Sequence, residues 1–310
     1  MEKFHEILRK NTFKKIFTLL LLGYFSASSV SAADNNKFGI HLAVPATEQI
    51  EKSAELVNSS GGDWGYITLV IQENDRNHDK WQDTFNKLRE LHLIPIIRLA
   101  TQQQGAMWRR PTEEDADQWA EFLNELNWVV KDRYIVIFNE TNHGAEWGGS
   151  VDPVGYAHVA QTFAEKIKAK NKDYFIMLGG FDASAPDVAP SYADEADYFK
   201  TVVDTIGVHK FNSLFSGLSS HSYPNPGFAG LPYGTGRGSV RTYEWELEQL
   251  KNWGVKELPV FITETGWDGN ALSRTTVASN FQTVFNSVWL PDDRVKAVTP
   301  FVLDYQGAPF

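Results

Sequence analysis

Short apolar runs recur along the chain at intervals that predict alternating strands and helices. Runs rich in β-branched and aromatic residues are typical of buried strands, and eight of them follow one another beyond residue 33. We predict strands at 38–44, 65–71, 93–99, 134–140, 174–181, 217–223, 258–264 and 297–303. Because helical segments fit between them, the strands are expected to be parallel.

The segments between these strands carry helical spacing and helix-start signals. Trp81, Phe85 and Leu88 recur at intervals of four and three, which is typical of one buried helix face. Asp152-Pro153 supplies an N-cap followed by a proline suited to the first turn. We predict helices over 47–58, from Asp79, from the capping box Thr112-Glu113-Glu114-Asp115, from Asp152, and over 192–206, 240–253 and 273–289.

Eight strands with crossover helices predict a single-domain α/β fold, the (β/α)8 TIM barrel. An open doubly wound sheet is the alternative, but no glycine-rich phosphate turn follows the first strand. The sequence ends at Phe310, directly after the eighth predicted strand, so we expect the last helix to be lacking. Either the chain is truncated or another segment covers that strand.

The first 33 residues have the composition of a secretory signal peptide. Five basic residues precede the apolar run 16–25, and small residues follow it, with Val30-Ser31-Ala32 fitting a cleavage site. The apolar run is short for a membrane span, although an uncleaved anchor is the alternative. We therefore expect one barrel domain over 34–310 that is secreted or held in the cell envelope, without stable membrane association.

Charge and cysteine content exclude several classes of function. Without residues 1–33 the chain has 24 basic and 37 acidic residues, a formal charge of −13. Such a surface argues against nucleic acid and anionic membranes, and it disfavours polyanionic sugars. Cysteine is absent, which excludes disulfides, thiolate metal sites and cysteine nucleophiles.

Two of the predicted strands end in a glutamate. The fourth runs to Glu140 and the seventh to Glu264, and these strands face each other across the mouth of a barrel. Active sites of parallel barrels lie at the carboxyl ends of the strands. A single glutamate there would be explained by an ion pair with Lys or Arg. Two of them predict the carboxylate pair that cleaves a glycosidic bond.

Polar residues at neighbouring strand ends support this interpretation. His221 and Tyr223 are two positions apart, so their side chains share one side of the sixth strand. The Tyr223 hydroxyl is placed to donate to Glu264 and keep it ionised. Arg98 follows apolar positions and needs a carboxylate partner, either Glu140 or Glu264. A buried structural histidine and a rim salt bridge are the alternative interpretations.

Aromatic residues after several strands suit a carbohydrate, whose apolar ring faces stack on aromatic rings. Any one of these residues alone fits core or rim packing better than sugar binding, but several on one face favour a binding cleft. The candidates are Trp108, Trp147, Tyr223, Tyr233 and Trp267, with Arg109, Arg110 and Asp182 as further polar candidates. No His-x-His pair occurs at His41, so we expect neither a metal site nor a cofactor.

Three short motifs resemble clan A of the glycoside hydrolases. They are Phe138-Asn139-Glu140, His221-x-Tyr223 and Ile262-Thr263-Glu264-Thr265-Gly266-Trp267. The resemblance implies that Asn139 holds a sugar 2-hydroxyl, Glu140 is the acid/base and Glu264 is the nucleophile. It also implies retaining hydrolysis of a polysaccharide or oligosaccharide, with no metal or organic cofactor.

The chain departs from the clan pattern at two places. Thr141 follows Glu140 where many members have proline, and Tyr305 is expected to replace the tryptophan that ends the eighth strand. The Glu-Thr-Gly-Trp string resembles families acting on β-1,3-glucans, which favours a β-glucan, while cellulase-like and mannanase-like activities stay open. A glucan-remodelling transglycosylase and a non-catalytic carbohydrate-binding barrel are the alternatives.

Overall fold

The computed structural model describes residues 36–59 and 62–304. The predicted signal peptide, residues 1–33, and the predicted platform residue Tyr305 lie outside this range. Within the described ranges, no helix combines the length and apolar character that crossing a membrane requires.

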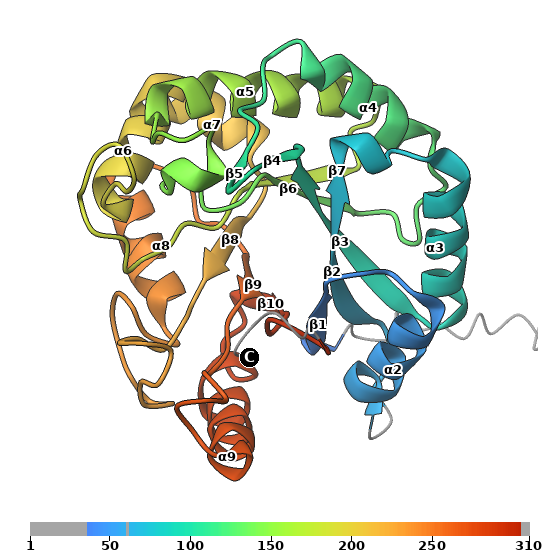
Figure 1. Ribbon diagram of the computed structural model, residues 1–310, viewed down its shortest axis with the longest axis vertical. Coiled ribbons are helices and arrows are strands. Elements are labelled where there is room, and N and C mark those ends of the chain that lie inside the picture. The colour runs from blue at the N-terminus through green and yellow to red at the C-terminus, as the bar shows by residue number, and fades with distance from the viewer. Residues whose placement is uncertain (1–35, 60–61, 305–310) are drawn as a thin grey trace, which may run out of the picture. The chain divides into compact units, whose positions relative to one another are not determined.

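Eight parallel strands surround one central core. Five form one sheet in the order β1 (Gly39–Leu42), β2 (Gly65–Gln72), β3 (Leu93–Ala100), β6 (Arg133–Ile137) and β7 (Tyr174–Leu178). Three form a second sheet, β8 (Leu218–His221), β9 (Val260–Glu264) and β10 (Val295–Val298). Parallel bridges connect the sheets at both junctions, Phe38 to Val298 at one and Asp182 to His221 at the other. The strands therefore follow one another around a ring (Figure 1), which is a (β/α)8 barrel.

Helices cover the outside of this ring (Figure 1). They are α2 (Thr47–Val57), α3 (His78–Glu90), α4 (Asp115–Glu125), α5 (Pro153–Lys170), α6 (Glu195–Ile206), α7 (Val208–Leu214), α8 (Thr242–Asn252) and α9 (Arg274–Val284). A π-helical turn, η4 (Phe285–Trp289), continues α9. Shorter elements decorate the loops, namely η2 (Glu73–Asp75), the hairpin β4 (Gln103–Gln104) and β5 (Met107–Trp108), and η3 (Gly144–Glu146).

Local sequence explains where several helices begin. The Asp152 side chain accepts a hydrogen bond from Gly155 N, and Pro153 is the first residue of α5, as predicted. Asn77, rather than Asp79, caps α3 by accepting from Lys80 N. These side chains satisfy amide groups that have no partner inside the helix.

Two apolar cores lie on either side of the strands. The larger fills the space between the strands and the helices, and the smaller fills the barrel interior. Along β3, Ile94 and Ile96 point into the barrel while Ile97 and Leu99 face the helices, as the period of two requires. The interior residues are Tyr66, Ile94, Ile96, Tyr134, Val136, Met177, Phe261 and Ala297. The barrel is therefore a packed core, and space for a ligand is left only at its end.

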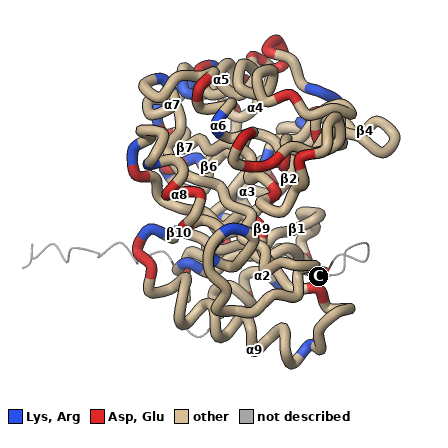
Figure 2. Tube along the Cα trace, turned by 90° about the vertical axis from the view of Figure 1, so that its left-hand side faces the viewer, with Lys and Arg blue, Asp and Glu red and all other residues tan. Residues whose placement is uncertain are grey.

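Charged residues fall mainly on helices and loops (Figure 2). Within the eight barrel strands the charged residues are Arg98, Arg133, Glu264 and Lys296. Arg98 and Glu264 are largely buried and pair with each other, with Nη1 and Oε1 2.5 Å apart. Among the Lys, Arg, Asp and Glu side chains of these described strands, the buried ones therefore form one ion pair.

Several predicted strands end or begin at other residues in the structure, and two of them have a local cause. The strand predicted at 134–140 ends at Ile137, because Phe138 has a φ of 67° that extended backbone cannot accommodate. The strand predicted at 297–303 is Val295–Val298, because Pro300 offers no N–H to a ladder. The remaining predicted strands overlap the observed ones.

Two acidic side chains are buried together beneath the barrel strand β8. Glu195 begins α6 and Glu246 lies on α8, and their exposed fractions are 0% and 1%. Burial raises the pKa of both carboxyl groups, and the charge of Glu246 raises that of Glu195 further. Arg237 Nε lies 3.7 Å from Glu195 Oε2 and offsets part of this effect.

We predict that Glu246→Gln stabilises the protein at alkaline pH. The folded chain keeps protons on this pair that the unfolded chain releases above about pH 4.5, so stability falls as pH rises toward and beyond 7. Because the amide in Glu246→Gln does not ionise, the variant should not lose this stability. Its free energy of unfolding at pH 8 should exceed that of the wild type by about 1 kcal/mol, or roughly 2–4 °C in Tm. Thermal unfolding at pH 5 and pH 8 measures it.

The matched control is Glu248→Gln, an exposed carboxyl on the same helix. It is expected to leave the pH dependence of Tm unchanged. Equal loss of Tm between pH 5 and pH 8 in wild type and Glu246→Gln would contradict the assignment of a raised pKa to this pair.

Candidate active site

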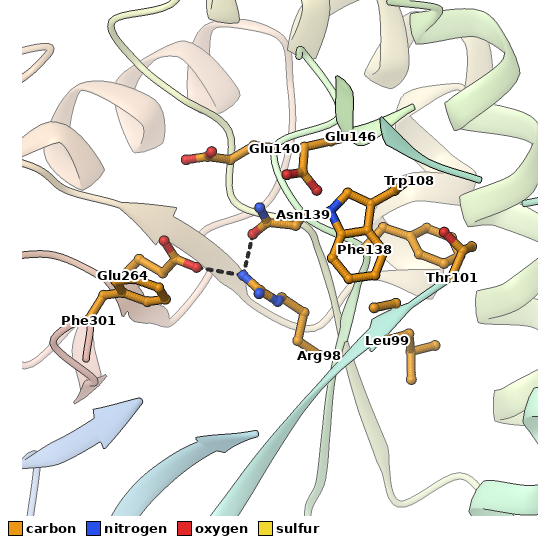
Figure 3. A pocket seen from close by; sticks show the side chains of 11 residues that line it. Arg98, Leu99, Thr101, Trp108, Phe138, Asn139, Glu140, Glu146, Glu264 and Phe301 are labelled. Carbon is orange, nitrogen blue, oxygen red and sulfur yellow. Dashed lines mark hydrogen bonds and ion pairs between the residues drawn. The ribbon is translucent and has the colours of Figure 1, made fainter. Parts of the chain in front are cut away.

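A pocket of about 270 Å³ opens at the carboxyl ends of the barrel strands (Figure 3). Its volume is near the lower end of the range typical of small-molecule sites, about 300–1,000 Å³. Its lining residues are Arg98, Leu99, Ala100, Thr101, Trp108, Phe138, Asn139, Glu140, Glu146, Glu264 and Phe301. The structure therefore brings both predicted carboxylates to one pocket, at the barrel end where active sites lie.

Glu264 is held at the end of β9 by hydrogen bonds from two neighbours. Arg98 Nη1 donates to its Oε1 and also to Asn139 Oδ1. The Tyr223 hydroxyl donates to its Oε2 at 3.0 Å, the hydrogen bond predicted from the sequence. Both carboxylate oxygens thus have partners, which fixes the orientation of the group.

The same neighbours keep Glu264 ionised. Burial alone would raise the pKa of this carboxyl group, but the positive charges of His221 and Arg98 outweigh it. With the hydrogen bond from Tyr223 they lower the pKa to about 2. Glu264 is therefore a carboxylate throughout the neutral range, as a nucleophile must be.

An irregular pairing between β8 and β9 places His221 beside the second carboxylate, Glu140. Ser220 pairs with Ile262, but His221 pairs with Glu264, so one residue of β9 is skipped. Such a bulge re-aims the side chains that follow it. His221 Nδ1 then lies 2.7 Å from Glu140 Oε1 and 3.9 Å from Glu264 Oε2.

His221 is positioned between the two glutamates as a charged group. Its ring is fully buried, which by itself lowers the pKa, but the carboxylates of Glu264 and Glu140 outweigh burial and raise it. Gly180 makes room for the ring, because a Cβ at that position would lie 2.2 Å from His221 Cδ2. A side chain at residue 180 would displace the histidine.

Glu140 follows β6 through strained backbone. Phe138 and Glu140 have φ values of 67° and 32°, in the left-handed region that non-glycine residues rarely adopt. Hydrogen bonds hold this turn, with Glu140 N donating to Gly180 O at 2.9 Å. Strain of this kind persists where surrounding structure holds it, often at functional sites.

The separation of the carboxylates is short. One oxygen of Glu140, one oxygen of Glu264 and one ring nitrogen of His221 all lie within 4.8 Å of one another. Carboxyl groups about 5–5.5 Å apart are typical of retaining glycosidases, whereas inverting enzymes need about 6.5–9.5 Å. Three such groups also resemble a metal-ligand set, but Arg98 already neutralises Glu264, and His221 is bonded to Glu140.

Other histidines surround this pair. His41 is buried on β1, and burial together with the Arg98 charge lowers its pKa to about 3, so it is neutral beside Glu264. His143 Nε2 lies 2.9 Å from Asp182 Oδ2, and burial of this histidine is outweighed by that carboxylate, which raises its pKa.

Not every predicted aromatic residue reaches the pocket. Trp108, on β5, lines it together with Asn139. Trp147 and Trp267 are 1% and 2% exposed and pack in the outer core, Trp147 against Phe138 and Tyr156 and Trp267 against Phe281. The structure therefore places both tryptophans behind the pocket wall instead of on it. Three other predicted candidates do not line the pocket either. Arg109 pairs with Glu73 and Asp115, and Arg110 pairs with Asp152. Tyr233 is exposed.

Phe301 and Glu146 line the pocket but were not among the site residues predicted from the sequence. Phe301, after β10, adds an aromatic ring to the pocket and packs edge-on against His41. Glu146 ends η3 and adds a third carboxyl group. Both lie in irregular segments, where neither strand nor helix periodicity gives a signal.

Similar folds occur among solved structures. A monomeric β-xylosidase from Caulobacter crescentus CB15 has a TM-score of 0.61 at 15% identity, over 86% of this chain and 60% of that chain. A glucosidase from Croceicoccus marinus has a TM-score of 0.62 at 11% identity, over 90% and 61%. A β-mannanase from Thermomonospora fusca has a TM-score of 0.52 at 14% identity, over 87% and 80%. The fold is a (β/α)8 barrel.

The chain spans about 60% of the length of the xylosidase and glucosidase chains. No protein-family model matches the chain. No curated protein matches its sequence.

We predict that Arg98→Gln destabilises the fold by leaving Glu264 buried without its counter-charge. The expected loss at pH 7 is about 3–5 kcal/mol, the cost of breaking a buried ion pair from one side. The lowered pKa of Glu264 means that the wild type has this stabilisation above about pH 4.5 and loses it as pH falls through about 2. The difference in free energy of unfolding between wild type and Arg98→Gln should therefore shrink as pH falls from about 4.5 toward about 2. Urea unfolding across this pH range measures it.

Arg274→Gln, on the exposed face of α9, is the control and should change stability little at any of these pH values. Equal stability of wild type and Arg98→Gln at pH 7 would show that the pair contributes nothing to the fold.

Proposed function

We propose that the protein is a retaining glycoside hydrolase that cleaves a β-linked oligosaccharide or polysaccharide by double displacement. The observation that carries this proposal is the pair Glu140 and Glu264, with carboxylate oxygens within 4.8 Å in a pocket at the barrel mouth. The different surroundings of the two glutamates assign them different roles.

In the first step Glu264 attacks the anomeric carbon. Its ionised state and its fixed orientation, from Arg98 and Tyr223, suit a nucleophile. Glu140 gives its proton to the departing glycosidic oxygen as the bond breaks. Since Glu140 Oε1 contacts His221 Nδ1, the proton belongs on Oε2, and the positive imidazole stabilises the carboxylate that forms.

In the second step water releases the sugar. Glu140, now a carboxylate, takes a proton from the water as the oxygen attacks the anomeric carbon, and the ester bond to Glu264 breaks. Two inversions at one carbon give net retention of configuration. Asn139, held by Arg98, is available to bind the sugar 2-hydroxyl, as the resemblance to clan A implies.

The substrate is proposed to be a neutral β-linked glycan, with β-glucan favoured by the Glu264-Thr265-Gly266-Trp267 motif. The structurally similar proteins are named as a β-xylosidase, a glucosidase and a β-mannanase, so xylan and mannan belong in the same test. The negative charge of the chain disfavours acidic glycans.

Product analysis tests the reaction. We expect residues 34–310 to release short oligosaccharides from one of β-1,3-glucan, cellulose, mixed-linkage glucan, xylan and mannan, and NMR of the first products to show the anomer of the substrate. Glu264→Gln should lower the rate at least 1,000-fold because the nucleophile is lost.

Three outcomes would contradict this proposal. Inverted product would exclude double displacement. Formation of longer oligosaccharides from short ones would instead identify a transglycosylase. Binding of a glycan by the folded wild type without turnover would identify a carbohydrate-binding barrel.

A second prediction separates the roles of the two carboxylates. In Glu140→Ala, a dinitrophenyl glycoside should still react with Glu264, because its leaving group needs no proton. The second step loses its base, so azide should accelerate turnover and yield a glycosyl azide of retained configuration. Azide should not give a glycosyl azide of retained configuration with Glu264→Ala. If it did, Glu264 would be the acid/base and Glu140 the nucleophile.

A further inference from the structure

The pocket holds a third carboxyl group that the proposed reaction does not use. Glu146 ends the short helix η3 and lines the pocket with Glu140 and Glu264. In Figure 3 its carboxyl group points toward the space bordered by Asn139 and Trp108. No described residue forms a hydrogen bond or close ion pair with that group.

The surroundings of Glu146 make this position costly without a ligand. Burial raises its pKa to about 7, and the charges of Glu140 and Glu264 add to this effect. Arg98 and His143 oppose it without contacting the carboxyl group. A partly buried polar group with no partner in the protein indicates that its partner comes from outside.

The backbone holds Glu146 and Trp108 on one wall of the pocket. Gly148 N donates to Trp108 O at 2.9 Å, which connects the hairpin strand β5 to the segment after η3. The adjacent Trp147 is buried in the outer core and anchors the segment. Arg110 Nη2 also donates to Trp147 O at 3.2 Å. The two pocket residues are therefore presented together by a fixed loop.

We propose that Glu146 and Trp108 form a sugar-binding subsite, in which a neutral sugar ring stacks on Trp108 and its hydroxyl groups bond to Glu146. The proposal rests on the proposed function for its position beside the cleaved bond, but binding can be measured apart from cleavage. It assigns Glu146 as a specificity-determining residue, distinct from the catalytic pair.

The chemistry of both residues selects the ligand class. An indole ring stacks on the apolar face of a sugar, and a carboxyl group accepts hydrogen bonds from hydroxyls. A sugar that carries its own carboxylate would add a further negative charge beside Glu146, whose pKa is already raised by neighbouring carboxylates. A neutral ring satisfies Glu146 without adding charge.

Calorimetric titration of the full chain carrying Glu264→Gln tests the subsite without consuming the ligand. The probes are xylotetraose, mannotetraose, cellotetraose and laminaritetraose, with a glucosamine tetramer as the cationic comparison. We expect a neutral tetrasaccharide to bind, and added Glu146→Gln or Trp108→Ala to weaken it about tenfold. Adding Glu55→Gln, an exposed carboxyl on α2, is the control and should leave affinity unchanged.

The design separates this inference from the proposed reaction. Unchanged affinity in a folded Glu146→Gln protein overturns the subsite, as does the absence of binding by all four neutral probes. Preferential binding of the glucosamine tetramer, lost in Glu146→Gln, replaces the hydroxyl assignment with an ammonium group. Binding that depends on Glu146 in a wild type that cleaves nothing supports the subsite and overturns the hydrolase.

Discussion

The ion pair between Arg98 and Glu264 is the constraint on which the rest of the site depends. Two charges placed among the inward-facing ends of barrel strands are costly unless they meet each other with good geometry. Their contact ties β3 to β9 across the barrel mouth and, through Arg98, fixes Asn139 as well. Arg98 and Tyr223 donate to the two oxygens of Glu264, whereas His221 contacts Glu140. The two carboxyl groups therefore have different surroundings.

Departures from regular geometry carry this arrangement. A skipped residue in β9 brings His221 level with Glu264. Positive φ angles at Phe138 and Glu140 end the side-chain alternation of β6 at the proposed acid, Glu140. A regular barrel would present side chains in fixed layers. The irregular strand ends allow residues from β3, β6, β8 and β9 to converge on one point.

The sequence predicted the parts of the site that lie on regular strands. Strand periodicity located Arg98, Glu264 and the Tyr223 contact, because a period of two states which side chains share a face. It could not place Glu146 or Phe301, since loop positions depend on contacts distant in sequence, such as Gly148 to Trp108. It also offered Trp147 and Trp267 as binding residues, because an aromatic residue in a loop gives the same signal whether it packs inward or faces a ligand.

The pocket also shows how one set of charges serves both stability and chemistry. Arg98 and the charged His221 lower the pKa of Glu264, so folding is favoured by the same interactions that keep the proposed nucleophile ionised. At Glu146 the charges of Arg98 and His143 offset only part of the effect of burial, and its pKa is about 7. A hydrogen bond from a sugar hydroxyl would offset the cost of placing this carboxyl group without a partner in the protein. An uncompensated carboxyl beside a compensated one is therefore the arrangement expected where a protein reserves a contact for its ligand.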